Sequence, residues 1–456
     1  MGGIFGALQI GLKNLSNMRE GLAVVNENVA NVNTPGYSRK RMILQSGPAD
    51  YRPYGSVGTG ADIQRIESVR DYFLESRLRA EYETKGFFEG QQSGTAQLES
   101  LLSTGDEAGL PEQMSRFFNS FLELSASPSS IPLRQAVISE GEQLASWFQR
   151  TSSQVDSLQL NNHVRVKDSV DNINFLLSRI SVINSRLEPL LARGQDGGSL
   201  FDERQELLKE LSTEIGIQVT TDQTGSQTIS TTNGRLLLAG SDYRQLSAEE
   251  TSSGMVVRSG SADITSELKT GRLGGLLSFE DTVLASFRTS LNSLTKQLAE
   301  AVNSTHRNGV DLDGNAGQDF FQFSAGAEAG TISVVISDPR AIAAATSGGV
   351  GDGRNAQTLA DIREQSFAGL EGQSVHGFYS QMAFEVGLAM RGVKANAELQ
   401  DKILRELQNQ REAVSGVSLD EEAVNLLQYQ RSYQASSRLI KVLDQLLEET
   451  LGLVRS

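Results

Sequence analysis

The side chains in this sequence that could carry out chemistry are few, and they lie far apart. Its three histidines, His163, His306 and His376, have no neighbours at the spacings of metal ligands, and the 456-residue chain contains no cysteine. A catalytic base or a metal site requires several such groups held together in fixed geometry. The lack of cysteine also excludes disulfides and thiolate nucleophiles. We therefore expect the histidines to be packing or surface residues.

One acidic segment, residues 311–316, is similar to the opening of a calcium-binding loop. Such a loop needs glycine at its sixth position and a bidentate glutamate at its twelfth. This sequence has Ala316 and Gln322 there, so a turn before the apolar pair Phe320 and Phe321 is the better interpretation. The chain also lacks the glycine-rich phosphate and dinucleotide motifs and the Gly-x-Ser-x-Gly elbow. The sequence thus predicts no catalytic residue, no metal site and no cofactor, and a protein that is not an enzyme.

The composition argues against nucleic-acid and membrane partners. The formal net charge is −15, from 41 basic and 56 acidic residues, whereas a phosphate backbone requires a concentrated basic face. No stretch of 18 or more apolar residues occurs, so we expect no membrane-spanning helix. Residues 1–8 lack the basic start of a cleaved signal peptide. If the protein is exported, we expect a route that leaves the N-terminus uncleaved.

The first thirty residues predict one long helix with a heptad seam. Apolar side chains recur at alternating gaps of four and three residues, and Gly11 is the only weak position. This N-terminal assembly seam consists of Ile4, Leu8, Leu15, Met18, Leu22, Val25 and Val29. The opposite face suits water or a polar partner, because it carries Lys13, Asn14, Asn17, Glu20 and Asn28.

A tight turn should follow this helix. The helix is expected to end near Asn31, because Asn33 tolerates left-handed backbone geometry and Pro35 cannot continue the helical hydrogen bonds. The sequence Thr34, Pro35, Gly36, Tyr37 is typical of a type II turn, in which the third position has a positive φ that glycine adopts without strain.

The C-terminal end repeats the helical pattern. After Gly416, the hydroxyl of Ser418 and the acids behind it predict a helix start. The C-terminal assembly seam consists of Leu419, Leu426, Tyr433, Ile440, Leu443, Leu447 and Leu451, with Gln430 and Ser437 as interruptions. Leu427, Leu439 and Leu446 widen the apolar stripe beyond what one partner helix can cover, so we expect more than one neighbour.

Two interpretations of the terminal helices stay open. They could be ordinary surface helices packed on a globular core, or they could pair with each other and with copies from other subunits. Residues 1–45 carry five basic groups and two acids, a net +3, and residues 418–456 carry four basic groups and six acids, a net −2. Opposite signs favour pairing, although exposed charges contribute little individually.

The middle of the chain is expected to be mainly helical. Residues 71–214 have a helical pattern, and a second long helix is indicated from Phe279 to Leu298. Strands are expected at residues 61–69 and 331–336, residues 215–257 have a β texture with a hairpin signal at Asn233-Gly234, and residues 348–353 form a glycine-rich loop.

The fold class is therefore mainly α with a small inserted β subdomain, as an elongated multi-domain rod whose terminal helices pair as a coiled coil. The predicted division is 1–40 for the N-terminal helix, 41–214 for a linker plus a long-helix bundle, 215–265 for the β-rich insertion, 266–414 for the second half of the helical domain, and 415–456 for the C-terminal helix. The fourth range contains the strand and glycine-rich loop at 320–355. The first and last ranges would form one inner domain.

The end of the first helix resembles a known family. Residues 28–39 are similar to the N-terminal signature of bacterial flagellar axial proteins, which rod, hook and hook-associated proteins share. The residues of this axial-protein motif are Asn28, Asn31, Asn33, Thr34, Pro35, Gly36 and Tyr37. Residues 200–208, 215–219, 271–277, 309–321, 415–422 and 430–435 resemble the hook-associated protein 1 family more specifically. The resemblance covers nearly the whole chain, and the variable middle is short for the family.

This resemblance implies a structural subunit of the junction between the flagellar hook and the filament, located in the extracellular flagellum. It implies secretion through the flagellar type III export apparatus without a cleaved signal, and homo-oligomerisation in a ring or helical assembly whose inner tube is made by the terminal helices. The implied partners are the hook protein, the second hook–filament junction protein, and a cytosolic export chaperone that holds the C-terminal helix.

Two rival functions remain. A flagellar hook or distal rod protein shares the first forty residues, but those families lack the long helical stretch of residues 90–215. A secreted coiled-coil adhesin or effector would leave motility intact when its gene is deleted.

Overall fold

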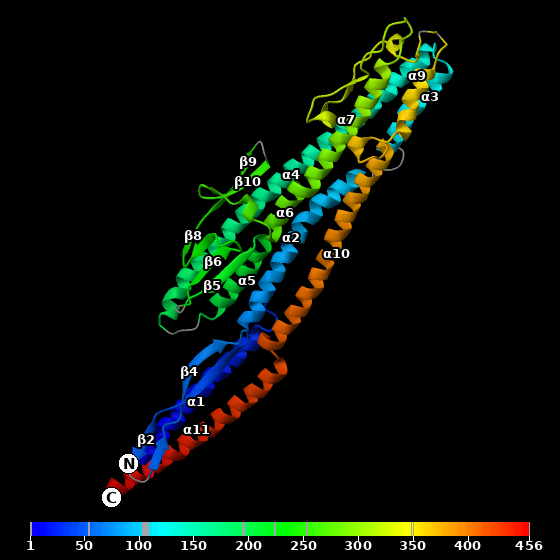
Figure 1. Ribbon diagram of the computed structural model, residues 1–456. Helices are drawn as coiled ribbons and strands as arrows, with labels where there is room; N and C mark the ends of the chain where they lie inside the picture. Colours follow the sequence, from blue (N-terminus) through cyan, green and yellow to red (C-terminus); the bar gives the residue numbers. More distant parts are fainter. Residues whose placement is uncertain are drawn as a thin grey trace. The chain divides into compact units, whose positions relative to one another are not determined.

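The computed structural model describes residues 2–52, 55–102, 109–193, 197–222, 225–251, 254–347, 349 and 351–455. These residues are mainly helical with small antiparallel sheets, as the sequence predicts (Figure 1). The chain forms two compact units. Unit 1 comprises Met1–Glu83, Asn172–Gln245 and Gln400–Ser456, and unit 2 comprises Thr84–Asp171 and Leu246–Leu399. Both ends of the chain therefore belong to the same unit, and the five predicted ranges stay a prediction.

Unit 1 contains the terminal helices and the elements that hold them. Its helices are α1 (Gly2–Ala30), α5 (Ser199–Glu214), α11 (Leu419–Arg455), and parts of α2 (Tyr72–Leu102), α4 (Ile131–Leu191) and α10 (Val375–Ser415). Helix α1 ends one residue before Asn31, and α10 ends one residue before Gly416, as predicted. The hydroxyl of Ser418 accepts a hydrogen bond from the Glu421 amide at 3.4 Å, so the predicted start of α11 is confirmed.

A long β-hairpin follows α1, and most of it was not predicted. Strand β1 (Lys40–Ser46) pairs with β4 (Ala61–Ser68), and β2 (Ala49–Arg52) pairs with β3 (Gly55–Gly58). Only β4 was expected from the sequence. The other strands have no clear alternation of apolar and polar residues, because residues 47–60 contain Gly47, Pro48 and further glycines and all of β3 is exposed.

The β-rich segment holds two sheets. In unit 1, β5 (Ile217–Thr221), β6 (Gln227–Thr231), β7 (Leu236–Ala239) and β8 (Asp242–Tyr243) form a four-stranded meander, and Gly234 has a φ of 83° in the predicted hairpin turn. In unit 2, β9 (Leu246–Thr251), β10 (Gly254–Ser259) and β11 (Ala262–Asp263) form a three-stranded sheet.

Unit 2 is a helical body with a phenylalanine core. Its own helical elements are α3 (Leu110–Ala126), α6 (Gly271–Ser278), the π-turn η2 (Phe279–Leu284), α7 (Ala285–Arg307), α8 (Glu328–Thr331), α9 (Arg354–Asp361), and the short turns η1 (Thr265–Glu267), η3 (Pro339–Ala341), η4 (Ile362–Glu364) and η5 (Ala368–Leu370). Phe117, Phe320 and Phe321 are fully buried, with ring centroids 4.7–5.6 Å apart, so the apolar pair Phe320 and Phe321 anchors its segment in the core.

One predicted strand is confirmed only in part. Of residues 331–336, only β13 (Ser333–Val334) is a strand, which pairs with β12 (Phe321–Gln322), while Thr331 ends α8. The β-branched residues there anchor an irregular segment instead, since Ile332 and Ile336 are buried. Within the predicted loop 348–353, Gly348 and Val350 lie outside the described residues. Among the described residues, no helix combines the length and the apolar character needed to cross a bilayer.

Candidate functional site

Helices α1 and α11 pack side by side in an antiparallel pair (Figure 1). Gly11 lies against Ile440, the Asn14 amide donates to the Ser436 hydroxyl at 2.7 Å, and Gly21 lies against Tyr429. A Cβ atom added to Gly21 would be 3.0 Å from the Tyr429 ring, and one added to Gly11 would be 3.1 Å from Ile440. The two glycines therefore let the helices approach closely, which explains why the predicted seam is interrupted at Gly11.

Helix α1 has two neighbours, α11 and the β1–β4 hairpin. Met18 and Val25 are buried, Ile4, Leu8, Leu15 and Leu22 are partly buried, and Val29 is exposed. The polar face is covered as well, because the β1–β4 hairpin packs on it. Asn17 donates to the Ala61 carbonyl at 2.8 Å, and the Lys13 ammonium lies 2.5 Å from the Asp62 carboxylate. Both Asn17 and Asn28 are buried, which the sequence pattern did not indicate.

The side of α11 that faces α1 contains more polar residues than the predicted seam. Glu422, Tyr429, Ser436 and Leu443 follow one another at intervals of seven residues, and Glu422, Ser436 and Leu443 are buried. Of the other residues of the predicted C-terminal seam, Leu426, Ile440 and Leu447 are partly buried at the edge of the contact with α1. Leu419 and Tyr433 are exposed, and the side chain of Leu451 lies outside the described part of the chain. The heptad spacing of the polar residues was the signal that could have identified them.

Helix α11 also carries an apolar stripe that its pairing with α1 leaves exposed. We call it the outer stripe, and it consists of Val424, Leu427, Leu439, Val442 and Leu446, which are 42–64% exposed. At 100° per residue, Val424, Leu427 and Val442 point about 100° or more away from the line that contacts α1, and Leu439 and Leu446 flank that line at about 40–60°. The sequence indicated an apolar stripe on α11 that is wider than one partner helix can cover. The part that α1 leaves exposed is therefore still available to contact another helix.

The axial-protein motif forms a joint beside this helix pair. The Tyr37 amide donates to the Thr34 carbonyl at 3.2 Å and Gly36 has a φ of 77°, which confirms the predicted type II turn. Asn31 and Gly36 are partly buried, and Asn33, Thr34 and Pro35 are exposed.

Asn28 connects the joint to the hairpin. Its side chain is 1% exposed, and its Oδ1 accepts hydrogen bonds from the Tyr37 hydroxyl and the Lys40 amide, both at 2.9 Å. Its Nδ2 donates to the Lys40 carbonyl at 2.9 Å. Burial and nearby carboxylates raise the pKa of Tyr37 above its ordinary value, so the phenol keeps the proton that this contact needs.

Helices α2, α5 and α10 hold the other side of the joint. Arg411 of α10 donates to the Gly36 carbonyl at 2.8 Å and to the Glu75 carboxylate at 2.7 Å. Arg70 donates to Asp202 of α5 at 2.7 Å, in a nearly buried ion pair next to Ser38. Burial raises the pKa of Asp202, and Arg70 opposes that shift. The turn is therefore held in place by charged side chains.

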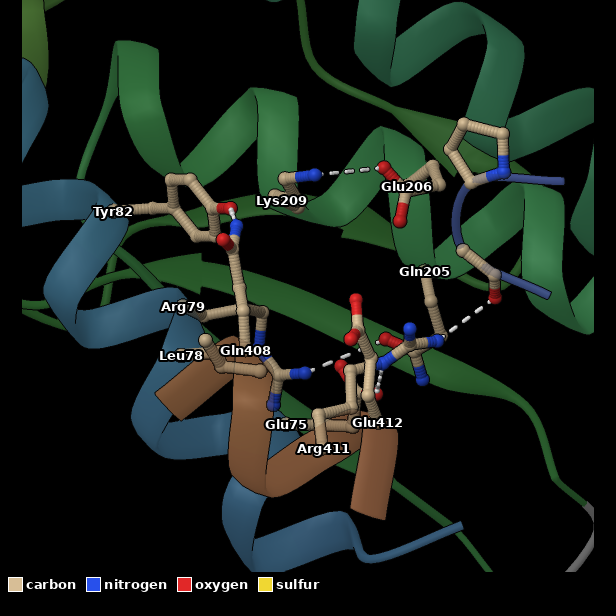
Figure 2. Close-up of a pocket in the computed structure, with 12 residues that line it drawn as sticks. Glu75, Leu78, Arg79, Tyr82, Gln205, Glu206, Lys209, Gln408, Arg411 and Glu412 are labelled. Carbon is tan, nitrogen blue, oxygen red and sulfur yellow. Dashed lines mark hydrogen bonds and ion pairs between the residues drawn. The ribbon is translucent and has the colours of Figure 1, made fainter. Parts of the chain in front are cut away.

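A cavity of about 220 Å³ lies next to the turn, as Figure 2 shows. It is lined by Pro35, Gly36, Glu75, Leu78, Arg79, Tyr82, Gln205, Glu206, Lys209, Gln408, Arg411 and Glu412. Lys209 pairs with Glu206 at 3.0 Å and lies over the Tyr82 ring, and Arg411 pairs with Glu75. Burial lowers the pKa of Arg79, whose guanidinium reaches Gln205 at 3.4 Å. The lining thus combines one ion pair within α5 and one ion pair that connects α2 to α10.

Two of the histidines are buried packing residues, and the acidic segment forms a turn. His306 is buried, donates from Nδ1 to the Gln318 carbonyl at 2.6 Å, and accepts from the Ala343 amide at Nε2. His163 lies between Glu250 and Glu280, and His376 is exposed. Asp311 accepts from the amides of Asp313 and Asn315, so it closes a turn. Among the described residues, no three acidic or histidine side chains are placed to hold a metal ion.

Acidification should destabilise unit 2 through His306. Burial lowers its pKa from 6.5 to about 4, so the folded state keeps it neutral while the unfolded state takes up a proton below pH 6.5. This contribution is present above pH 6.5 and is lost as the pH falls towards 4, by up to about 3 kcal/mol. The free energy of unfolding, measured with denaturant at pH 6.5 and at pH 4, should change less between the two pH values for His306→Gln than for the unchanged chain. His376→Gln is the matched control and should leave it unchanged, and an equal pH dependence in all three chains would contradict the assignment.

Comparisons with known proteins agree with this architecture. The model of the flagellar hook-associated protein FlgK helical domain matches residues 95–321, and that of the flagellar basal body rod FlgEFG protein C-terminal region matches residues 408–453. Flagellar hook-associated protein 1 of Bacillus subtilis is 27% identical over 98% of both chains, and that of Escherichia coli is 24% identical over 97% of this chain and 98% of its own.

The fold has a solved relative. The flagellar hook junction protein FlgK from Burkholderia pseudomallei superposes with a TM-score of 0.68 at 15% identity, over 74% of this chain and all of that one. The helical-domain match falls on the helices of residues 95–321, and the relatives align over nearly the full length, including the terminal helix pair and its joint. The chain belongs to the flagellar hook-associated protein 1 family.

Proposed function

We propose that this chain is a structural subunit of the bacterial flagellum that polymerises at the hook–filament junction and joins the hook to the filament. The observation that carries the proposal is the outer stripe, which stays exposed although α11 is already paired with α1. Exposed apolar side chains that recur along one side of a long helix are typical of a protein–protein interface. Its position on the terminal helices favours neighbouring copies as the partners.

The other partners follow from the same surface and from the names of the relatives. We propose the hook protein on one side of the assembled ring or helix and the second junction protein on the other. We propose a cytosolic export chaperone for the C-terminal helix, because an exposed apolar stripe favours aggregation before assembly and a bound partner would cover it. Export would follow the flagellar route without cleavage of the N-terminus, and the assembled protein would be extracellular and act without catalysis.

The rival functions are less well supported. The rod-protein match is confined to residues 408–453, whereas the hook-associated helical-domain match spans residues 95–321. An adhesin or effector would have no need for terminal helices that share one unit with the axial-protein motif.

Deletion of the gene tests the proposal. We expect a non-motile strain whose hooks are present and whose filament protein is found in the medium, because filaments would have no junction to attach to. Electron microscopy and immunoblotting of the culture supernatant measure both results. Intact motility would contradict the proposal, and loss of the hooks themselves would favour the hook or rod alternative.

A further inference from the structure

The β-hairpin that follows α1 has a ladder anchored on α1 and an exposed tip. At the base, Asn28 binds both backbone groups of Lys40, and at the far end of the β1–β4 ladder Asn17 binds the Ala61 carbonyl. Gly60 lies against Ile10, because a Cβ atom added to this glycine would be 3.4 Å from the Ile10 side chain. The hairpin therefore runs along α1 from Asn28 towards Ile10, and strands β2 and β3 extend beyond that point.

We call residues 49–52 and 55–58 the hairpin tip. Its two strands pair over four positions, from Ala49 with Gly58 to Arg52 with Gly55, and no third strand pairs with them in the described chain. Every side chain described in the tip is exposed, and Tyr51 is 86% exposed, the largest value among the exposed large hydrophobic side chains of the described residues. A two-stranded hairpin without a packed face is only marginally stable in water.

The chain offers a matching surface on α1. Phe5 and Leu12 are 52% and 51% exposed, and their spacing of seven residues places them on one face about 10 Å apart. A tyrosine buries a large area at a small cost in side-chain entropy, and its hydroxyl can stay at the wet edge of an interface. Phe5 and Leu12 together have the size and chemistry to receive such a ring.

We infer that the hairpin tip docks on a second copy of this chain, with Tyr51 packed against the exposed face of α1 that carries Phe5 and Leu12. This inference rests on the proposed function. The outer stripe and the hairpin tip are carried by the same helix pair, so a copy that covers the outer stripe would also lie within reach of the tip. A contact between the tip of one copy and α1 of the next joins two different surfaces. Such a contact can repeat from copy to copy, as a ring or helical assembly requires.

Photo-cross-linking in assembled flagella tests the inference. A benzoylphenylalanine in place of Tyr51 keeps an aromatic side chain at an exposed position, so the chain should fold and assemble. We expect an adduct of twice the chain's mass, with the cross-link in the tryptic peptide that ends at Lys13. The same probe in place of Tyr243, which is 41% exposed on β8, is the control and should give no such adduct.

A third probe position separates this inference from the proposed function. At Val442 the probe reports on the outer stripe. An adduct of two copies from Val442 with none from Tyr51 would overturn the hairpin contact and leave the proposed function intact. An adduct of the Tyr51 probe with another flagellar protein, or with a different region of the second copy, would also overturn the inference. No adduct of two copies from either position would count against both.

Discussion

Val442→Asp is expected to abolish incorporation of the protein into the flagellum while leaving unit 1 folded. Val442 is 52% exposed on the outer stripe, so aspartate is accommodated in the free chain. In the assembly the same position would be buried against a neighbour. Losing a buried valine and burying a carboxylate together cost roughly 3 kcal/mol or more at each contact, about a hundredfold in the binding constant. Every subunit carries the change, so the loss recurs around the whole junction.

Gln430→Asp is the matched control, because it adds the same charge at an exposed position of α11 that lies off the outer stripe. It should assemble and support motility. Attached filaments counted by electron microscopy, together with circular dichroism of each purified chain, measure the two effects. Normal filament attachment with Val442→Asp would contradict the role of the outer stripe.

Asn28→Ala is expected to loosen the joint between α1 and the hairpin. The substitution removes three hydrogen bonds and leaves the Tyr37 hydroxyl and both backbone groups of Lys40 without their partner. Groups left unsatisfied in a buried site cost about 1–3 kcal/mol each, and partial access of water reduces the sum to roughly 3 kcal/mol. Amides of residues 31–46 should therefore exchange with solvent roughly a hundredfold faster.

Asn26→Ala is the control for this prediction, because Asn26 lies on the same helix and is exposed. Its effect should stay within about 0.5 kcal/mol, as is usual for surface substitutions. Hydrogen exchange measured by mass spectrometry compares the three chains. Equal exchange in residues 31–46 for Asn28→Ala and the unchanged chain would show that the joint is held without Asn28.

Local signals in the sequence predicted the helices and the turn well. The heptad pattern of α1, the Ser418 start of α11 and the turn with Gly36 at its third position depend on neighbouring residues alone. For the same reason the Asn233-Gly234 hairpin was found. The strand predicted at residues 331–336 was too long, because a short β-branched run looks the same in a strand and in a buried irregular segment.

Features that depend on distant contacts could not be predicted. The hairpin of residues 40–68 has one strand with a clear pattern, and the others are ordered by pairing. Asn17 and Asn28 were expected to face water or a polar partner, and only the folded chain shows the hairpin covering them. The division into two units joins residues 172–245 to both chain ends, which no local pattern indicates.

The central claim is that the outer stripe is open in the free molecule and covered in the assembly. Because the chain has no cysteine, a single Val442→Cys variant gives a unique thiol whose rate of modification by a maleimide can be measured in dilute monomer and in isolated flagella. Rapid modification of the monomer and strong protection in flagella is the predicted result, with Gln430→Cys as the reference position. Slow modification in the dilute monomer, or the same rapid rate in both states, would contradict the account.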